Sequence, residues 1–353
     1  MTTQLEQTIQ SIKPLDENAM QAARARQNEL TKPPGSLGRL EVLSIQIAGI
    51  TARPRPTLRR PAIITLAADH GVARQGVSAF PIEVTAQMVL NFLRGGAGIN
   101  VLARHVGAEV IVADVGVAVD LPADDDLIVH KIDYGTRDLS TEPAMTREQA
   151  RQSIQVGMAI AQNAIARGCD IVGTGEMGIG NTTPSSAIAA VFTGRPVREL
   201  TGRGSGVDDA GLTRKITVIE AALARHQPNP ADGLDVLSKV GGFEIGGLAG
   251  VMLAAAAARV PVVVDGFISG AAALIAASLA PAVRDYMIAA HRSVEIGHRA
   301  ILDHLGLHPV LDLDLRLGEG TGAALAISIC QAACKVLDEM ATFAEAGVSN
   351  KTS

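Results

Sequence analysis

Leucine alternates with polar residues in the stretch LDLDLRLGEGTG at residues 311–322. A repeat at every second position predicts a half-buried strand, and Gly318 is expected to end it because glycine adopts backbone angles that other residues avoid. The apolar run that follows predicts a helix up to Met340, with Thr321 capping its first N–H groups. Glu319 is therefore expected on a strand-to-helix turn, the position at which open α/β sheets bind their ligands.

The rest of the chain repeats this alternation of short apolar runs and segments of helix length. Continuous apolar runs are typical of parallel strands that are covered on both faces. Strands joined through helices form right-handed crossovers, so the pattern predicts an α/β fold with a mostly parallel sheet flanked by helices. The expected strands cover residues 62–67, 109–115, 170–174 and 260–265, with a short apolar run at 127–132, and the helices between them include 82–93, 99–105, 146–167, 212–225 and 294–305.

The N-terminal part carries no strand pattern. Asp16 is a suitable N-cap for a helix that runs to about Leu30, where the sequence KPPG at residues 32–35 interrupts it. A second helix is expected over residues 37–50, before the proline-rich segment 53–61 leads to the first strand. The two helices are expected to form a helical appendage.

Composition and charge exclude several classes of protein. Hydrophobic residues make up 47% of the 353 positions, so the chain is not disordered and is long enough to bury a large core. The 31 Lys and Arg against 36 Asp and Glu give a net charge of -5, and without a basic tract this argues against a nucleic-acid partner. The most apolar stretch, residues 245–258, is shorter than the roughly 20 residues of a membrane span.

The cysteines and the first residues indicate a compartment. Cys169, Cys330 and Cys334 form no CxxC pair and are odd in number. The opening sequence MTTQLEQTIQ lacks the apolar core of a signal peptide. Because disulfides are rare in the cytoplasm and none is indicated here, we expect a reducing, cytoplasmic location.

The glycine-rich segment GTGEMGIGNTTPSSA at residues 173–187 has three interpretations. Its first six residues match the dinucleotide pattern GxGxxG, but the segment does not open the first crossover, and Glu199 lies in a loop where the pattern needs an acid that ends a strand. The backbone N–H groups from Gly175 to Asn181, with Thr182 ahead of a helix N-terminus, would instead attract a phosphate. Close packing of a strand against a helix explains the glycines equally well.

Three charged residues near these segments each have two interpretations. Glu176 would repel a phosphate but accepts hydrogen bonds from ribose hydroxyls, so it is either a sugar contact or a satisfied core carboxylate. Lys215 would supply the positive charge that a phosphate needs, although a lysine on a helix surface is usually only solvated. Glu319 is either a catalytic carboxylate or a carboxylate without a function on a tight turn, and the motif taken alone favours the second interpretation.

The remaining acidic and histidine motifs do not support a metal. VVVDGFISG at residues 262–270 has a single acid after its strand, and Asp208 and Asp209 lie in a loop, so a magnesium-held diphosphate is not supported. His70 and His291 are isolated from Cys and from other His residues, which favours packing or loop histidines over metal ligands. We expect no metal and no cofactor.

Six segments taken together resemble one family, nicotinate-nucleotide:dimethylbenzimidazole phosphoribosyltransferase, which prepares the lower ligand of cobalamin. The resemblance covers nearly the whole chain, and several of the motifs are long and unusual. The segments are KPPGSLGRLE at 32–41, ADHGV at 68–72, GEMGIGNTTPSSA at 175–187, QPNPADGLDVLSKVGGFE at 227–244, VVDGFISGAAAL at 263–274 and RLGEGTGAAL at 316–325.

The resemblance implies a fold and an assembly. The family's fold is similar to a Rossmann-like, mostly parallel sheet flanked by helices, with a small helical domain built from both chain ends, in a homodimer. It places the catalytic α/β domain at residues 61–321. The small domain would then consist of residues 1–60 together with the C-terminal helix at 322–353.

The resemblance also implies the reaction. The family transfers the 5-phosphoribosyl group from nicotinate mononucleotide to 5,6-dimethylbenzimidazole, releasing nicotinate and forming α-ribazole 5'-phosphate. Its general base falls on Glu319. Because the donor's pyridinium nitrogen is already positively charged, nicotinate leaves without a proton, and one base is enough. One ring nitrogen of the acceptor attacks from the back and inverts the anomeric carbon, while Glu319 takes the proton from the other ring nitrogen.

By the same resemblance, each substrate is expected to contact its own set of residues. The donor is expected near Glu176, Met177, Gly178, Asn181, Thr182, Lys215 and Ser293. The acceptor base is expected near Phe80, Gln87, Met88 and Leu317. Some members of the family have Ser in place of Phe80 and Gln in place of Met88, so this pocket is more apolar and its preferred base stays open. An NAD-dependent oxidoreductase using GTGEMG and a nucleotide-binding sensor without chemistry are the alternatives.

Overall fold

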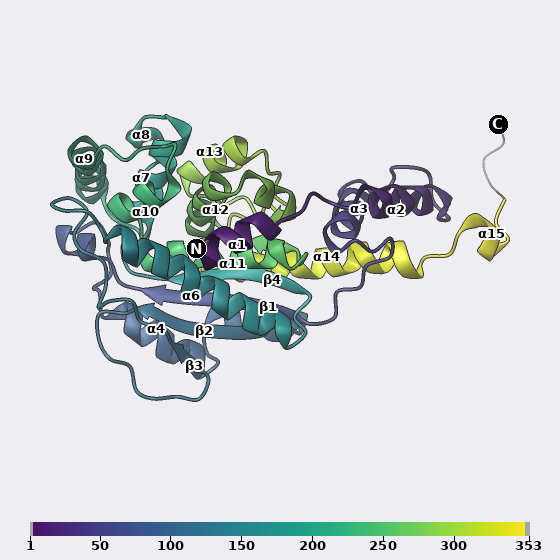
Figure 1. Ribbon diagram of the computed structural model, residues 1–353, viewed down its shortest axis with the longest axis horizontal. Helices are drawn as coiled ribbons and strands as arrows, with labels where there is room; N and C mark the ends of the chain where they lie inside the picture. Colours follow the sequence, from purple (N-terminus) through teal and green to yellow (C-terminus); the bar gives the residue numbers. More distant parts are fainter. Residues whose placement is uncertain (1–2, 350–353) are drawn as a thin grey trace.

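Six parallel strands form the centre of the protein in the computed structural model, which describes residues 3–349 (Figure 1). Their order in the sheet is β3-β2-β1-β4-β5-β6, and all five pairings are parallel. The chain therefore winds outward from β1 in both directions, as in doubly wound nucleotide-binding folds, which confirms the predicted fold class. The strands are β1 Pro61–Ala68, β2 Glu109–Gly116, β3 Leu127–Val129, β4 Ile171–Met177, β5 Val262–Val264 and β6 Met287–Ala289.

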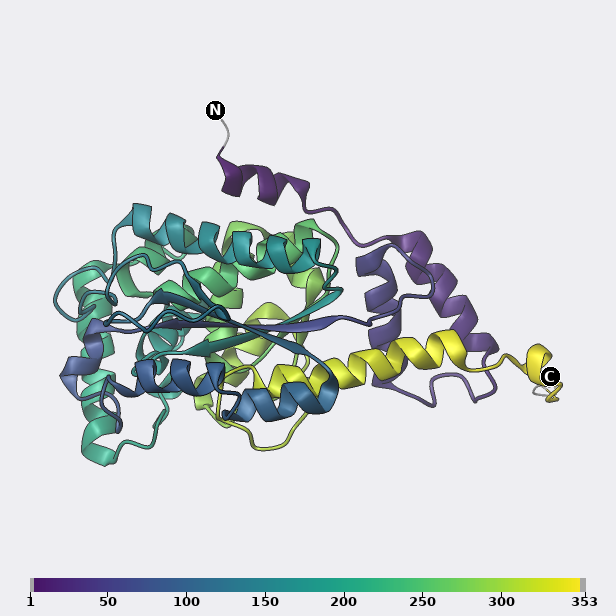
Figure 2. The same cartoon turned by 90° about the horizontal axis from the view of Figure 1, so that it is seen from below.

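Helices cover both faces of this sheet. Alternate residues of β1 point to opposite faces, so Ile64 and Leu66 belong to one core cluster and Ile63 and Ala67 to another. The first cluster is covered by α6, α11 and α12, and the second by α4, α5 and α14, which lie on opposite sides of the edge-on sheet in Figure 2. The helices are α1 Gln4–Ser11, α2 Glu17–Glu29, α3 Arg39–Thr51, α4 Val84–Leu93, α5 Gly98–Val106, α6 Arg147–Ala166, α7 Thr182–Thr193, α8 Val197–Leu200, α9 Asp209–His226, α10 Gly233–Val240, α11 Phe243–Ala257, α12 Phe267–Leu279, α13 Ile296–Leu305, α14 Thr321–Glu339 and α15 Phe343–Ala346, with short 3₁₀ helices at Gly71–Gln75 and Pro281–Tyr286.

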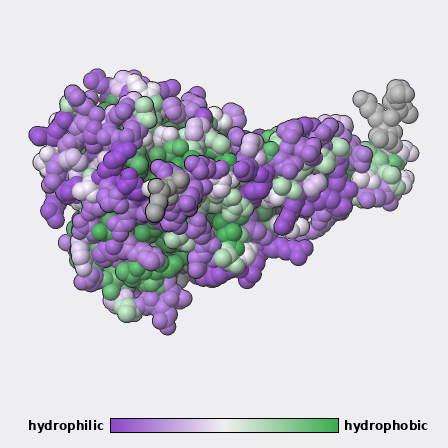
Figure 3. Space-filling view, viewed as in Figure 1, coloured by the Kyte–Doolittle hydropathy of each residue, from purple (hydrophilic) through white to green (hydrophobic). Residues whose placement is uncertain are grey.

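Helices from the N-terminal and C-terminal parts of the chain pack together at one end of the molecule. Helices α2 and α3 pack against each other and against α14, with Ala23, Ala48 and Leu337 buried among them (Figure 2). On the face seen in Figure 3 this end is mostly hydrophilic, and the larger hydrophobic areas lie over the sheet. Helix α1 lies apart from this bundle, against α6 and α11. The division into a catalytic domain at 61–321 and a small domain stays a prediction.

Helix α14 joins the bundle to the sheet. It is long and apolar enough to span a membrane by length and composition, but 56% of that stretch is buried inside the protein. Its apolar residues contribute to the core cluster that covers one face of β1. We therefore interpret α14 as a core helix.

Two predicted helix starts are confirmed. Asp16 caps α2 by accepting a hydrogen bond from the backbone N–H of Ala19 at 2.8 Å. Thr146 caps α6 through the N–H of Gln149 at 3.1 Å. Both are oxygen-bearing side chains that accept an otherwise unpaired N–H at a helix start, which is why the sequence predicts them well.

The predicted strand at residues 311–317 is wrong. Only Leu311 makes a bridge, with His291, and the segment then leaves the sheet. Leu313 and Leu317 are 53% and 60% exposed, so their alternation does not mark a buried face. The edge strand on this side of the sheet is instead β6, three residues long, which the sequence pattern did not indicate.

Two local predictions around the glycine segments also change. Thr321 is the first residue of α14 rather than its cap, and its hydroxyl donates to the carbonyl of Gly318 at 2.8 Å. The N-cap is Gly320, which has a φ of 97° and no side chain to offer. Strand β4 extends to Met177, so Glu176 lies within the strand and not in a turn after it.

A glycine contact between α6 and α11 gives a test of the packing. A Cβ added at Gly157 would lie 1.7 Å from the carbonyl oxygen of Gly247, and backbone cannot move away easily. Helix propensity alone predicts that Gly157→Ala stabilises the protein by about 1 kcal/mol. We expect the opposite sign, a loss of about 1–3 kcal/mol or more in the free energy of unfolding, measured by urea denaturation.

The matched control is Ala159→Gly on the exposed side of the same helix. It should cost only the propensity difference of about 1 kcal/mol. A higher midpoint of unfolding for Gly157→Ala would show that the two helices are not in close contact.

Candidate active site

A cavity of about 730 Å³ opens at the carboxyl ends of the parallel strands. Its walls come from the end of β4, from Asp265 after β5 and from His291 after β6. Parallel α/β sheets bind their ligands at these carboxyl ends of the strands. Of the twelve residues predicted for the site, nine line the cavity. They are Phe80, Met88, Glu176, Met177, Asn181, Thr182, Ser293, Leu317 and Glu319.

Glu319 is held in one orientation at the wall of this cavity. Its carboxylate accepts a hydrogen bond from the N–H of Ile99 at the start of α5, at 3.0 Å, and only 5% of the residue is exposed. Its φ of 64° lies in the left-handed region, as do those of Gly318 and Gly320 on either side. Burial raises the pKa of Glu319, although the N–H groups of Ile99 and Gly98 oppose the rise. A fixed carboxylate with a raised pKa has the properties of a general base.

Glu176 lies beside the turn that carries Glu319. A Cβ added at Gly318 would lie 2.3 Å from its Oε1, so the two segments are in contact. Burial raises the pKa of Glu176 to about 8, the hydrogen bond that Asn181 donates opposes this, and nearby carboxylates raise it further. At neutral pH Glu176 is therefore mostly protonated and has a hydroxyl proton to donate.

Lys215 is buried behind the cavity wall and is not a solvated surface lysine. Its Nζ lies 2.6 Å from the hydroxyl of Thr182 and 3.4 Å from the carbonyl of Gly202. Burial lowers its pKa to about 8, and the carboxylate of Glu295 opposes the shift. Lys215 does not itself line the cavity, but Thr182, whose hydroxyl its Nζ contacts, does.

Ser293 and Gly178 complete the predicted donor residues. The backbone N–H of Ser293 donates to Nδ1 of His298 at 3.0 Å, and its hydroxyl accepts a hydrogen bond from the N–H of Glu295 at 3.3 Å, which leaves the hydroxyl proton to donate to a ligand. Gly178 lies outside the lining of the cavity. A Cβ there would meet the carbonyl of Ala68 at 2.4 Å, so glycine allows β4 to pass close to the end of β1.

The predicted acceptor residues lie toward the mouth of the cavity. Phe80 and Leu317 line it and are 53% and 60% exposed, and Met88 lines it from α4. Gln87 precedes Met88 on the same helix, is exposed and does not line the cavity. The apolar wall on this side consists of Phe80, Val84, Met88 and Leu317.

The segment GTGEMG does not form a dinucleotide-binding turn. Five of its six residues belong to β4 instead of opening a helix. A Cβ added at Gly175 would lie 2.3 Å from the carbonyl oxygen of Glu319. Gly175 therefore serves close packing, and it allows the Glu319 turn to sit against the strand.

Comparison with known proteins shows the family of the chain. A family model described as phosphoribosyltransferase matches residues 12–348. The chain is 71% identical over 347 residues to the nicotinate-nucleotide--dimethylbenzimidazole phosphoribosyltransferase of Chloroflexus aggregans, covering 98% of each chain. The chain belongs to this phosphoribosyltransferase family.

Further relatives support the assignment to the phosphoribosyltransferase family. The enzyme of the same name from Roseiflexus sp. is 69% identical over 98% of both chains. The crystal structure of the phosphoribosyltransferase of this name from Thermus thermophilus matches with a TM-score of 0.91 at 46% identity. That match covers 96% of this chain and all of the other.

Several groups in the site of this family member were not predicted from the sequence. Asp265 is buried, and its pKa is raised to about 7 by burial against the opposing effect of backbone N–H groups from the start of α14. Burial lowers the pKa of His298 to about 3, with a further contribution from His291, so His298 is neutral. Asp265 and His298 reach the site only because the folded sheet places the ends of β5 and β6 side by side, and the spacing of residues in the sequence does not show this arrangement.

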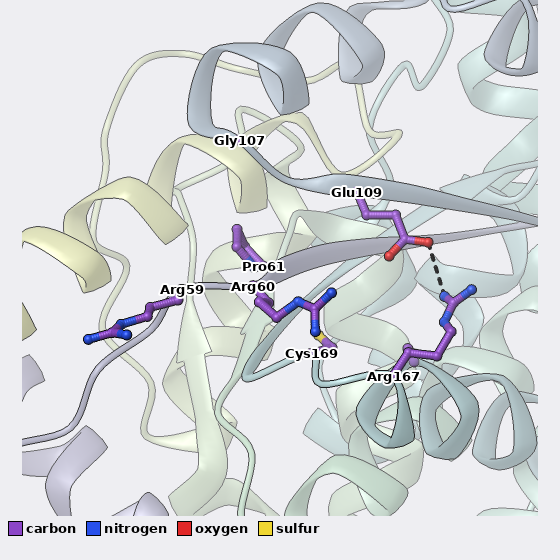
Figure 4. A pocket seen from close by; sticks show the side chains of 8 residues that line it. Arg59, Arg60, Pro61, Gly107, Glu109, Arg167 and Cys169 are labelled. Carbon is purple, nitrogen blue, oxygen red and sulfur yellow. Dashed lines mark hydrogen bonds and ion pairs between the residues drawn. The ribbon is translucent and has the colours of Figure 1, made fainter.

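A second pocket lies at the opposite ends of the strands. Arg60, Glu109 and Arg167 surround Cys169 there, at the amino ends of the strands (Figure 4). Arg167 is paired with Glu109 at 3.0 Å, and the carboxylate of Asp170 accepts two backbone N–H groups. Within residues 3–349, no group of three or more His, Cys, Asp or Glu side chains is placed to hold a metal ion. The cavity at the carboxyl edge is therefore the site that combines apolar walls with carboxylates of raised pKa.

Proposed function

We propose that the protein transfers the 5-phosphoribosyl group from nicotinate mononucleotide to 5,6-dimethylbenzimidazole, forming α-ribazole 5'-phosphate and nicotinate for the lower ligand of cobalamin. The observation that carries this proposal is the carboxylate of Glu319, buried, fixed by Ile99 and directed at a cavity of about 730 Å³. That volume falls within the range of pockets for small-molecule ligands, roughly 300–1,000 Å³.

The proposed chemistry needs a single base. The glycosidic bond of the donor breaks as its electron pair moves to the pyridinium nitrogen. The ring of the departing nicotinate becomes an uncharged pyridine, so this leaving group needs no proton. One nitrogen of the acceptor forms the new bond from the opposite side and inverts the anomeric carbon. Glu319 accepts the proton that the second ring nitrogen loses. A positioned base contributes about 10²- to 10⁴-fold, and alignment of the two substrates supplies a larger part.

The donor would lie along the side of the cavity formed by β4 and α7. Its phosphate is proposed to meet Thr182, Ser293 and the buried charge of Lys215, with the backbone around Met177 and Gly178. Glu176 and Asn181 would contact the ribose. A protonated Glu176 suits this place because it can donate to a hydroxyl oxygen without adding negative charge beside the phosphate.

The acceptor base would lie between the apolar residues at the mouth and Glu319. Phe80, Met88 and Leu317 offer flat and flexible apolar surface, which suits a methylated benzimidazole. Gln87 would take part only from the edge, because it does not line the cavity. The homodimer and the cytoplasmic location are also part of this proposal, and no cofactor is required by the chemistry.

One assay tests the proposed function. The purified protein is incubated with nicotinate mononucleotide and dimethylbenzimidazole, and the products are identified by mass spectrometry and NMR. We expect free nicotinate and the α-riboside in equal amounts. Binding of NAD with hydride transfer and no release of nicotinate would favour an oxidoreductase, and donor binding without turnover would favour a nucleotide sensor.

A further inference from the structure

Asp265 is a buried carboxylate that the proposed chemistry does not use. It directly follows β5, is 1% exposed, and donates its own N–H to the hydroxyl of Thr174 on β4 at 3.1 Å. Its Oδ1 accepts a hydrogen bond from the N–H of Ala323, in the first turn of α14, at 2.8 Å. The carboxylate thus connects the end of the sheet with the helix that begins immediately after the Glu319 turn.

Helix α14 has no cap of its own. The first N–H groups of a helix lack partners within it, and a side-chain oxygen at the N-cap usually satisfies one of them. Here the N-cap is Gly320, which makes no side-chain hydrogen bond. Asp265 supplies the missing acceptor from another part of the chain, and the ionised form of its carboxyl group also suits the positive end of the helix dipole.

The turn before α14 depends on such anchors. Gly318, Glu319 and Gly320 have φ values of 81°, 64° and 97°, and a glutamate in the left-handed region is strained. The carbonyl of Glu319 accepts a hydrogen bond from Thr65 at 3.1 Å, and its carboxylate accepts one from Ile99. These two contacts fix the backbone and the side chain of Glu319, while Asp265 fixes the start of the helix that follows.

Close packing holds the start of α14 against Asp265. A Cβ added at Gly322 would lie 2.0 Å from Cδ2 of His291 and 2.9 Å from Oδ1 of Asp265. His291 in turn lies 3.9 Å from Asp265 through its Nε2. No larger residue fits at position 322 without moving the helix away from the carboxylate.

We propose that Asp265 is a positioning residue. It caps α14 from a distant part of the same chain, fixes the start of this helix and so orients Glu319 toward the acceptor. The inference rests on the proposed function of Glu319 as the base. Asp265 acts through the helix start, because its Oδ1 is bonded to the N–H of Ala323. A shift of about 1 Å in a catalytic group costs about 10²-fold in rate, so a loosened cap has a large kinetic effect.

The test compares Asp265→Asn with Asp265→Ala. Asparagine keeps an oxygen that accepts from Ala323, so we expect it to retain much of the wild-type kcat. Alanine removes the acceptor, and we expect kcat to fall by about 10²-fold with little change in KM for nicotinate mononucleotide. Amide hydrogen exchange at Ala323 should become faster in Asp265→Ala and stay close to wild type in Asp265→Asn.

The control is Asp303→Ala, an exposed aspartate on α13, which should keep both constants. If Asp265→Asn is as inactive as Asp265→Ala and both raise KM for the donor, Asp265 contacts substrate and the proposal is wrong. Unchanged kcat in Asp265→Ala would also overturn it. Should Asp265→Ala not fold, the same comparison is made with Asp265→Ser, whose hydroxyl is too short to reach Ala323. Wild-type protein without transferase activity would instead reject the proposed function.

Discussion

Glu319→Gln is expected to lower kcat by about 10²- to 10⁴-fold and to leave the affinity for nicotinate mononucleotide nearly unchanged. Glutamine has the same size, and its carbonyl oxygen can still accept the hydrogen bond from Ile99, so the strained turn keeps its shape. What the variant lacks is a group that accepts the proton from the acceptor's ring nitrogen. Steady-state kinetics give kcat, and isothermal titration calorimetry gives the donor affinity.

The pH profile provides an independent check of the same base. Burial raises the pKa of Glu319, and only the deprotonated form is a base, so wild-type kcat should fall as the pH drops through a value above the ordinary carboxyl range. That acidic limb should be absent from the residual activity of Glu319→Gln. Glu199→Gln, an exposed glutamate on α8, is the control and should behave as wild type. Near-normal turnover of Glu319→Gln would reject this residue as the base.

The sequence predicts the central part of the fold because its signals there are local. Strand β1 is a run of apolar residues, interrupted only by Thr65, that is buried on both faces, and its composition is enough to identify it. Asp16 and Thr146 cap their helices through contacts three residues away, which a sequence pattern can show. The alternation of such strands and helices then leaves few topologies other than a parallel sheet.

The leucine repeat before Glu319 shows where pattern reasoning fails. A period of two predicts a strand when one set of side chains enters the core. Leu317 instead lines the cavity and is 60% exposed, so its side chain does not belong to the core, and we propose that it contacts the acceptor base. Strand β6 was missed for a different reason, because a run of only three apolar residues is too short to show a period of its own.

The candidate site was predictable only in part. Glycines on either side of a carboxylate identified Glu319 as unusual, and the structure adds that all three residues have positive φ. Lys215 gives no sign of burial in its helix sequence, and in the folded chain it contacts the start of α7 at Thr182 and the loop at Gly202. Asp265 caps a helix that begins 56 positions later, a contact that only the folded sheet creates.

Lys215→Met is expected to raise KM for nicotinate mononucleotide about 10- to 100-fold while changing kcat less. Methionine keeps the apolar stem but removes the charged donor that lies 2.6 Å from Thr182. A hydrogen bond to a charged group contributes about 1.5–3 kcal/mol, and each 1.4 kcal/mol is about tenfold in affinity. The loss should appear with nicotinate mononucleotide and not with a donor analogue that lacks the phosphate.

Protonation of Lys215 gives the prediction a second measurement. Its pKa in the folded protein is about 8 because the charged form is desolvated, against an ordinary value of 10.5. Above pH 8 the free enzyme loses the charge that we propose binds the donor phosphate, so the donor KM of the wild type should rise with pH, whereas that of Lys215→Met should not.

The lowered pKa of Lys215 also predicts how the free energy of unfolding changes with pH. Between about pH 8 and 10.5 the unfolded state holds a proton that the folded state has lost, so stability should rise with pH in the wild type relative to Lys215→Met. Lys239→Met, which removes a lysine paired with Asp235 on α10 away from the cavity, is the control and should leave the donor KM unchanged. An unchanged donor KM in Lys215→Met would place the phosphate elsewhere, because removal of a buried charge beside a bound dianion must weaken its binding.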